Sequence, residues 1–567
     1  IMIFRKIISI LDSKDKKTIF YLLLLSTFVS IVELLGVGVI LPFLDIVGNP
    51  DSLEAKGHYK FIYSFFDFND RTLFIIYFGV FLAFFYIFRG SLNLYYIYRL
   101  EKFALGKMRS MALRLLENYM NIDYGEFTKR NSSIFSKVIV IETFNLTNMM
   151  RALLLSVSEV LVLIFIYSAM MYVNYKITTS LTIFLLLVVF IFIKTISKKL
   201  KDSGVSRELH QRDYYEIINS TMGNFKFIKL YSENDRILKK FSDSSFLFIK
   251  ANISAAFLTH FPRLFLETVA FVLITLSITA TAWLTEGRVA EHLPTISFFV
   301  FGMYRLMPSI NRILTGYNTI LFNLRSLDIV HADLFYNSES LGSDYISFKD
   351  KISTRNVGFS YDKKNNVILN ANLEICKNDK IAIIGRSGSG KSTFVDMIIG
   401  LHKPDTGNIS VDGVTLTSQN IKSFRKKIGY VPQDLYLFDG NIKDNIVFGA
   451  VYDEKKLKDV LEKVDMLDFL NTSHNGIYTS VGEGGMQLSG GQKQRIAVAR
   501  ALYTEPEILV LDEATSSLDE DTERKIIDQI YNIGSKLTII MITHKMSSIG
   551  RCNKIYTLTD GRLEQIK

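Results

Sequence analysis

Six apolar stretches of membrane-spanning length occupy the first part of this chain and constrain its fold more than any other feature. They lie at residues 18–44, 73–99, 150–173, 177–196, 257–284 and 295–322. An α-helix needs roughly 20 apolar residues to cross the hydrocarbon core of a bilayer. The stretches therefore predict six transmembrane helices, and the aromatic content of 13% is also unusual for a soluble protein.

The part of the chain after residue 322 has no further stretch of that length and reads as a soluble α/β domain. A chain of 567 residues is too long for one compact domain. We predict a transmembrane domain over residues 1–335, with six helices and cytoplasmic loops, and a soluble domain over residues 345–567.

Charge asymmetry between the connecting segments predicts the orientation in the membrane. Lysine and arginine gather at residues 4–17, 101–137 and 194–250, whereas few occur at residues 45–70, 174–176 and 285–294. Positively charged loops stay in the cytoplasm, so both termini and the soluble domain are predicted to be cytoplasmic. This bias explains the net charge of +10, and no nucleic-acid partner is expected.

Cysteine and histidine usage excludes several kinds of site. The two cysteines, Cys376 and Cys552, both lie in the soluble part, which favours a reducing compartment over a disulfide framework. The eight histidines show no metal-ligand spacing. We therefore predict no zinc or iron site.

The soluble domain contains a sequence motif typical of a phosphate-binding loop. It fits the pattern G-x-x-x-x-G-K-[ST], follows the apolar run 380–384 and precedes a helical pattern; its residues are Gly385, Arg386, Ser387, Gly388, Ser389, Gly390, Lys391 and Ser392, with Thr393 next. Glycines let successive backbone N–H groups point at phosphates, and the helix N-terminus adds partial positive charge. We expect Lys391 on the β and γ phosphates and the Ser392 hydroxyl on Mg²⁺.

Two acidic residues follow a buried strand further along the chain. The apolar run Ile508–Leu511 ends in Asp512 and Glu513. Ligands of α/β proteins bind at the carboxyl ends of such strands. Asp512 is predicted to hold Mg²⁺, directly or through water, and Glu513 to act as general base toward the attacking water. The alternative is a helix cap and a solvated neighbour.

The run LSGGQ at Leu488–Gln492 stands between the phosphate loop and the acidic strand end. This combination resembles ABC exporter half-transporters, and the resemblance covers essentially the whole chain. It implies a type IV (exporter-type) transmembrane domain of six helices followed by a P-loop α/β ABC nucleotide-binding domain, with ATP and Mg²⁺ as cofactors. Since the expected residue types are present, it also implies an active ATPase.

The resemblance assigns roles to further residues of this sequence. It implies that Tyr361 stacks on adenine, that Gln433 contacts Mg²⁺, and that His544 lies near the γ-phosphate. The segment VGEGG at 481–485 and the loop from Ser517 to Asp519 match two further motifs of the family. In that family, the residues of the signature motif close on the ATP of a partner subunit. In this sequence, the signature residues are Ser489, Gly490, Gly491 and Gln492. The chain is thus expected to form a homodimer with two equivalent sites.

Four arginines fall within or beside the apolar stretches, at positions Arg89, Arg263, Arg305 and Arg312. Each costs about 3 kcal/mol near the bilayer centre and calls for a partner or a wet cavity. One reading is internal pairing, of Arg263 with Glu267 and of Arg89 with Glu33. The other is a ring of positive charge in the dimer, which suits phosphate or pyrophosphate on a cargo.

A closer resemblance concerns the stretches MYRLMPSINRI at 303–313, FPR at 261–263 and FRG at 88–90. They are similar to PglK-type flippases of bacterial N-glycosylation. This implies an ATP-driven flippase of the bacterial inner membrane that moves a lipid-linked oligosaccharide, a polyprenyl pyrophosphate glycan, or another anionic lipid to the outer leaflet. Export of lipid A, drugs or peptides is the alternative.

Three connecting segments carry further expectations. Residues 49–68 place apolar side chains at near-helical spacing and predict an interfacial helix that holds a polyprenyl tail; an ordinary packed loop is the alternative. By the resemblance, residues 117–137 and 220–234 contain the short helices that dock on the cassettes.

Overall fold

The computed structural model describes residues 2–48, 70–232, 234–284, 293–336, 339, 341–513, 527–531, 537–543 and 549–567. The chain divides into two compact units. The first comprises Ile1–Met120 and Asn131–Tyr336, and the second comprises Asn121–Arg130 and Asn337–Lys567. The predicted interfacial helix at residues 49–68 lies outside the described residues.

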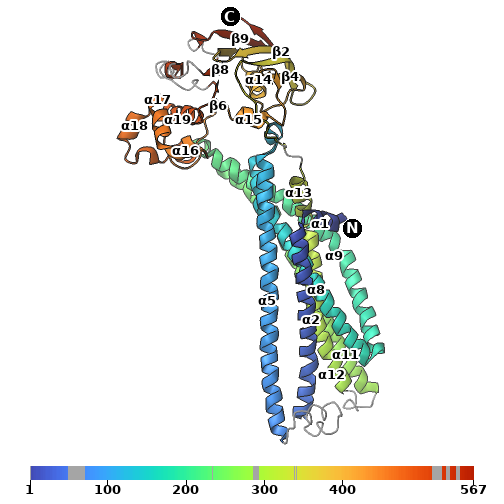
Figure 1. Cartoon of the computed structure of the whole chain (residues 1–567). Coiled ribbons are helices and arrows are strands. Elements are labelled where there is room, and N and C mark those ends of the chain that lie inside the picture. The colour runs from blue at the N-terminus through green and yellow to red at the C-terminus, as the bar shows by residue number, and fades with distance from the viewer. Residues whose placement is uncertain are drawn as a thin grey trace. The chain divides into compact units, whose positions relative to one another are not determined.

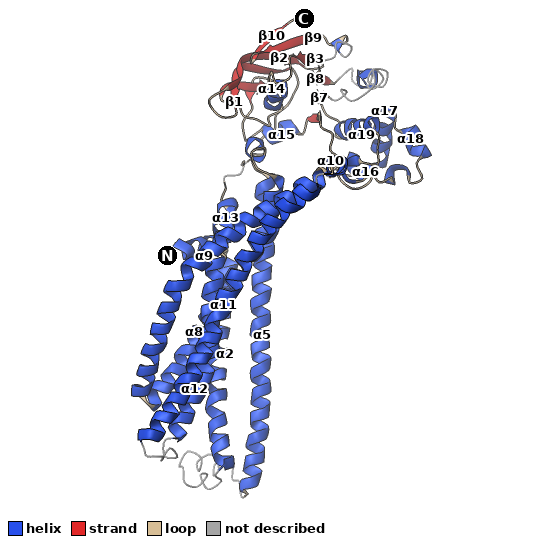
Figure 2. Cartoon of the chain, turned by 180° about the vertical axis from the view of Figure 1, so that it is seen from behind, coloured by secondary structure: helices blue, strands red, loops and turns tan. Residues whose placement is uncertain are grey.

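The first unit is helical throughout its described part. Its helices are α1 (Met2–Ile10), α2 (Ser13–Gly48), α5 (Arg71–Met120), α7 (Ser132–Lys137), the π-helix η1 (Val138–Glu142), α8 (Thr143–Val173), α9 (Tyr175–Gly223), α10 (Phe225–Tyr231), α11 (Asn234–Leu284), α12 (Leu293–Phe322) and α13 (Leu324–Leu334). The long helices run side by side, with α2 against α5, α8 against α12 and α9 against α11 (Figures 1 and 2).

Each of the six apolar stretches falls in a different long helix: α2, α5, α8, α9, α11 and α12. Among the described residues, three helical segments are long and apolar enough to cross a membrane, namely Ser13–Gly36, Arg71–Met120 and Ser133–Tyr172. Apolar side chains such as Phe84 and Leu94 of α5 and Phe190 of α9 remain exposed. Lipid-facing surface explains that exposure, because a soluble protein rarely leaves so large an apolar area in water.

The second unit is an α/β domain with two sheets in its described part. An antiparallel sheet has the order β2-β1-β4-β5, from β1 (Lys351–Ser360), β2 (Asn366–Cys376), β4 (Thr406–Val411) and β5 (Val414–Thr415). The other sheet has the order β10-β9-β3-β8-β7-β6, from β3 (Lys380–Ile384), β6 (Ile428–Val431), β7 (Ile508–Asp512), β8 (Thr538–Ile542), β9 (Lys554–Thr559) and β10 (Arg562–Gln565). Its strands pair in parallel except β10 with β9.

Helices complete this unit. They are α6 (Tyr124–Phe127), α14 (Lys391–Ile398), α15 (Ile421–Arg425), α16 (Ile442–Val447), α17 (Glu454–Lys463), α18 (Leu467–Thr472) and α19 (Gly490–Tyr503), with short 3₁₀ turns η3 (Gly476–Tyr478) and η4 (Glu483–Gly485). The strands β7 and β8 are buried along their whole length. Such continuous apolar strands are typical of a parallel sheet covered on both faces.

The short helix α6 belongs to the second unit although it lies far from it in sequence. We predicted residues 1–335 as one domain, and the structure instead assigns Asn121–Arg130 to the second unit. The backbone N–H of Glu339 donates to the carbonyl of Asn121 at 2.8 Å. This assignment depends on contacts between distant segments, which hydropathy and charge patterns do not report.

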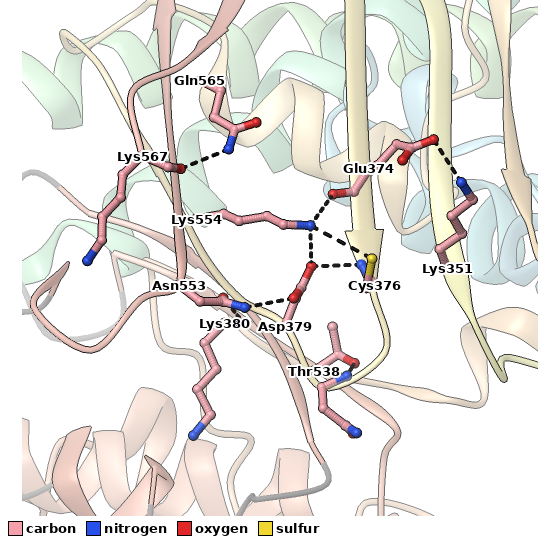
Figure 3. A network of polar contacts seen from close by, with 11 residues as sticks. Lys351, Glu374, Cys376, Asp379, Lys380, Thr538, Asn553, Lys554, Gln565 and Lys567 are labelled. Carbon is pink, nitrogen blue, oxygen red and sulfur yellow. Dashed lines mark hydrogen bonds and ion pairs between the residues drawn. The ribbon is translucent and has the colours of Figure 1, made fainter.

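A network of polar contacts holds β9 to the β2–β3 turn (Figure 3). Lys554 donates to the Asp379 carboxylate at 2.6 Å and to the carbonyl of Glu374 at 3.2 Å. Asn553 donates to the other Asp379 oxygen at 2.7 Å, and the N–H of Cys376 donates to Asp379 at 2.8 Å. Burial alone would raise the pKa of Asp379, but these hydrogen bonds lower it below its ordinary value of 3.8.

Asp379→Asn is expected to destabilise the second unit by about 1–3 kcal/mol, because the charged hydrogen bonds are lost. Thermal unfolding of the purified protein near pH 7 checks this expectation. A depressed pKa contributes stability above the unfolded value and loses it as pH falls, so the difference from wild type should shrink near pH 3.5. Glu374→Gln, which changes an exposed carboxylate, is the control and should change stability by less than about 1 kcal/mol.

Candidate functional site

The phosphate-binding loop connects β3 to α14 at the carboxyl end of the parallel sheet. Gly385, Gly388 and Gly390 have φ of 153°, 78° and 96°. A Cβ at Gly385 would lie 2.4 Å from the carbonyl oxygen of Leu558, so only glycine fits there. Gly390 is the N-cap of α14 and leaves the first N–H groups of that helix without a side-chain cap.

Lys391 is buried within this loop. Its Nζ donates to the carbonyls of Gly385 and Arg386, both at 3.0 Å. Burial lowers the pKa of Lys391, against the opposing effect of the Glu513 and Asp512 charges. The Ser389 hydroxyl oxygen is also buried and has no hydrogen-bond partner among the described residues. An unsatisfied hydroxyl, a lysine and uncapped helix N–H groups together fit a phosphate group.

Asp512 lies at the end of β7, next to the start of α14. The Ser392 hydroxyl donates to its Oδ1 at 3.3 Å, and the Tyr430 hydroxyl of β6 donates to its Oδ2 at 3.2 Å. Burial raises the pKa of Asp512 and outweighs these hydrogen bonds. The structure thus brings together Ser392 and Asp512, two oxygen ligands that suit Mg²⁺.

Glu513 follows Asp512 in a left-handed backbone conformation, with φ of 44°. Its N–H donates to the carbonyl of Ile542 at 3.0 Å, which extends the pairing with β8. Gln433 donates from Nε2 to the Glu513 carboxylate at 2.8 Å, so the amide oxygen of Gln433 is left for a cation. A positive φ in a non-glycine residue is uncommon, and such backbone strain often occurs at functional sites.

Tyr361 lies beside the phosphate loop and is half-exposed. Its hydroxyl shares a hydrogen bond of 3.0 Å with the Thr393 hydroxyl. Its ring also packs edge-on against Phe359, with centroids 5.0 Å apart, and against His402, with centroids 5.7 Å apart. An exposed aromatic face next to the phosphates is where a nucleotide base can stack.

The signature segment begins α19. Ser489 is the N-cap: its hydroxyl accepts from the N–H of Gln492 at 3.3 Å, and its own N–H donates to Oε1 of Gln492 at 2.8 Å. This reciprocal capping box satisfies two backbone donors. Ser489 and Gly490 are exposed, with Gly491 next in the first turn, so this helix end faces outward from its own unit.

Sequence analysis missed three residues that support these groups. Tyr430 holds Asp512, and burial together with the Asp512 charge raises the pKa of Asp396 on α14 to about 6. Arg500 of α19 donates to the carbonyl of Asn445 at 2.8 Å and to that of Tyr436 at 3.2 Å, which ties the signature helix to the segment after Gln433. No local pattern marks these residues, because their partners come from other strands and helices.

Some predicted site residues fall outside the described part of the chain. These are His544, Ser517 and Asp519. The residue before His544 is described: Thr543 follows β8 and its N–H donates to the carbonyl of Ile383 at 3.4 Å. The chain therefore enters that segment between the ends of β3 and β7.

The described membrane arginines form ion pairs. Arg89 meets Glu33 at 3.3 Å, and Arg263 meets Glu267 at 3.0 Å, both of which are the pairs weighed from the sequence. Arg312 of α12 meets Glu159 of α8 at 2.9 Å, a pair that sequence analysis missed. The Arg305 side chain lies outside the described side chains, although its backbone is part of α12.

Two family models match the chain. The model described as ABC transporter transmembrane region matches residues 18–306, more than half of the chain, and the model described as ABC transporter matches residues 368–516. The second match contains the phosphate loop, the signature segment and the acidic strand end. The first contains most of the helical unit.

Curated proteins with similar sequences are named as export, ATP-binding or flippase proteins. A putative export ATP-binding/permease protein of Rickettsia typhi is 32% identical over 395 residues, 65% of this chain and 64% of that protein. A heterocyst differentiation ATP-binding protein of Nostoc sp. is 31% identical, over 68% of this chain and 63% of that protein. The chain thus spans slightly less than two thirds of these relatives. An ATP-dependent lipid A-core flippase of Paraburkholderia xenovorans is 24% identical, over 80% of this chain and 77% of that protein.

The fold matches a solved structure of a bacterial Atm1-family ABC exporter with ATP bound. The TM-score is 0.79 at 21% identity, over 97% of this chain and 94% of that chain. This likeness concerns the fold alone. With the two family matches, it confirms the predicted fold class, an exporter-type transmembrane domain followed by a nucleotide-binding domain.

Proposed function

Because this chain belongs to the ABC transporter family, we propose that it is an ATP-driven exporter that works as a homodimer. The observation that carries the proposal is the meeting of Lys391, Ser392, Asp512, Glu513 and Gln433 at the carboxyl ends of β3, β7 and β6, which lie in one sheet with β8 between β3 and β7. A phosphate cradle, cation ligands and a carboxylate base in one place suit hydrolysis of a nucleoside triphosphate.

Each residue has a role in this proposal. The α14 N-terminus, Lys391 and Ser389 bind the phosphates, while Tyr361 stacks on the base. Ser392, Asp512 and Gln433 would hold Mg²⁺, which would supply positive charge beside the phosphate oxygens. The Glu513 carboxylate accepts the proton of the attacking water, and Gln433 orients that carboxylate.

The position of the signature helix supports the proposal of a homodimer. Ser489 and Gly490 are exposed at the N-terminus of α19, where N–H groups and the helix dipole favour an anion. We infer that they face the phosphates bound by a second copy of the chain. A two-fold dimer of this kind has two equivalent ATP sites.

The cargo we propose is a lipid-linked oligosaccharide, a polyprenyl pyrophosphate glycan moved to the outer leaflet of a bacterial inner membrane, with the ATPase domain and both termini in the cytoplasm. The resemblance at residues 303–313, 261–263 and 88–90 supports this choice. Arg263 and Arg312 keep 61% and 48% of their side-chain surface exposed while paired. A guanidinium carries five donors, more than one carboxylate uses, so a pyrophosphate can share it.

A second candidate cargo is lipid A. The relative named as a lipid A-core flippase is similar over 80% of this chain, a larger share than the export proteins reach. Both cargoes are anionic glycolipids with phosphate near the membrane surface. The same arginines would serve either one.

Proteoliposomes test the proposal. The purified protein is given ATP and a fluorescent polyprenyl-pyrophosphate oligosaccharide or, in a parallel arm, labelled lipid A. If ATP moves the oligosaccharide lipid and not lipid A, the result supports the oligosaccharide proposal. If ATP moves lipid A and not the oligosaccharide lipid, the result supports the lipid A alternative. Movement of neither, with normal ATPase activity, would exclude both cargoes.

Arg305→Ala combined with Arg312→Ala is expected to stop lipid movement and to leave basal ATPase activity within about twofold, since the arginines lie far in sequence from the cassette and bind cargo phosphate. Flipping and phosphate release are measured in the same proteoliposomes. Loss of the Arg312–Glu159 pair could by itself disturb the helices, so Arg305→Ala is also combined with Arg312→Ala and Glu159→Ala. Restored flipping in that variant would show that Arg312 acts only by neutralising Glu159 and that neither arginine is needed to bind the cargo.

A further inference from the structure

His402 is a buried aromatic residue at the centre of a ring cluster in the second unit, next to the proposed adenine-binding face. It follows α14, and its side chain is 5% exposed. Its ring lies 5.7 Å from that of Tyr361 at an interplanar angle of 88°, and 5.0 Å from that of Phe359. Phe359 in turn meets Tyr361 edge-on, at 5.0 Å and 86°. Edge-to-face packing of this kind has a preferred geometry, so it restrains the orientation of Tyr361.

The opposite side of His402 contacts α6. The ring of Tyr124 lies 5.4 Å from that of His402. A Cβ added at Gly125 would lie 3.4 Å from two atoms of the His402 ring, so the α6 backbone itself approaches closely. Asp123 caps α6 by accepting from the N–H of Gly125 at 2.8 Å, and its charge also acts on His402. One side chain therefore contacts both the half-exposed tyrosine and a helix that joins the two halves of the helical unit's sequence.

We propose that His402 is a positioning residue that holds Tyr361 in the orientation required for the adenine ring and makes that orientation depend on the docking of α6. The inference rests on the proposed function, because it takes Tyr361 as the adenine platform. The inference adds a specific path to the proposed function. In this path, α6 acts on binding of the base through the His402 ring, and not through the phosphate loop. Movement of α6 would then change the affinity for the adenine moiety without changing the grip on the phosphates.

This path predicts a separation between base and phosphate binding. The Tyr361 ring contributes only to ligands that carry a base, whereas Lys391 and Ser389 bind any triphosphate. A defect at His402 should therefore weaken ATP binding and spare inorganic tripolyphosphate. General damage to the domain would weaken both ligands.

The test uses the full-length protein in lipid nanodiscs and measures the dissociation constants of Mg²⁺–ATP and Mg²⁺–tripolyphosphate. His402→Ala is expected to weaken ATP binding about tenfold, the scale of one lost base–aromatic contact, with tripolyphosphate binding unchanged. His402→Phe, which keeps an aromatic ring of similar size, should restore ATP affinity. Tyr478→Ala removes an exposed tyrosine of the same unit and is the control.

Two variants of α6 test the second half of the proposal without altering the cassette. Tyr124→Ala removes the ring that packs on His402, and Gly125→Val inserts a side chain against it. Both should raise KM for ATP several-fold at unchanged kcat, because binding energy common to ground and transition states is lost. Unchanged KM in both variants would overturn the dependence on α6.

The remaining outcomes are decisive as well. Equal weakening of ATP and tripolyphosphate by His402→Ala, without rescue by phenylalanine, would assign His402 a merely structural role. Unchanged ATP binding in His402→Ala would overturn the positioning role. Failure of the wild-type protein to bind ATP would overturn the proposed function itself, and the inference with it. If the wild-type protein binds ATP normally, the proposed function stands whichever result the His402 and α6 variants give.

Discussion

Glu513→Gln is expected to lower kcat for ATP hydrolysis by about 10²–10⁴-fold and to leave ATP affinity within a few-fold of wild type. The amide cannot accept the proton of the attacking water, but it has nearly the same shape as the carboxylate and can still bond to Gln433. Because the substitution keeps the backbone and the shape of the side chain, we expect the left-handed φ of 44° at Glu513 to persist. Phosphate release and equilibrium ATP binding are measured on the same preparation.

The matched control for this variant is Glu505→Gln. It makes the same chemical change in the same unit, at an exposed residue paired with Lys456 at 3.3 Å. We expect wild-type hydrolysis from it. Wild-type hydrolysis by Glu513→Gln would contradict the assignment of Glu513 as the base. Loss of ATP binding in that variant would show instead that Glu513 shapes the binding site.

Lys391→Met is expected to weaken ATP binding by about 100-fold or more. In the proposed site, the buried ammonium would donate charge-assisted hydrogen bonds to phosphate oxygens, and loss of about 3 kcal/mol corresponds to that factor. Methionine keeps much of the length and volume of the side chain, which is 5% exposed, so the loop is not emptied. Binding is measured with a fluorescent ATP analogue, and hydrolysis should fall below detection at concentrations that saturate the wild type.

Lys380→Met at the other end of β3 is the control for Lys391→Met. The Lys380 ammonium lies 4.7 Å from the Tyr531 ring centroid and has no place in the proposed site. The affinity of the Lys380→Met protein for ATP should equal that of the wild-type protein. Since Lys391 also donates to the carbonyls of Gly385 and Arg386, thermal unfolding is compared as well. Unchanged ATP affinity in a folded Lys391→Met protein would remove Lys391 from phosphate binding.

The ion pairs of the membrane arginines differ in how well they could be predicted from the sequence. Internal pairing of Arg263 with Glu267 could be read from the sequence, because residues four apart share a helix face. The pair of Arg89 with Glu33 required only that α2 and α5 be neighbours, as elements that follow one another along the chain commonly are. The pair of Arg312 with Glu159 joins α12 to α8, and no local pattern indicates that these helices pack together.

Features that depend on neighbouring residues along the chain could be predicted from the sequence alone. The length of an apolar stretch is enough to predict a helix that can cross a bilayer, and the eight residues of the phosphate loop carry their own backbone geometry. Two acids directly after a buried strand are likewise placed at a sheet edge by their position alone.

Contacts between segments that are far apart in the sequence became apparent only in the folded structure. The strand order β3-β8-β7-β6 brings Tyr430 to Asp512, and the packing of α6 within the second unit brings Tyr124 to His402. These contacts are set by how strands pair and how side chains fill the space between elements, and the sequence separation of the partners carries no signal for either. The supporting residues of the site were therefore visible only in the folded chain.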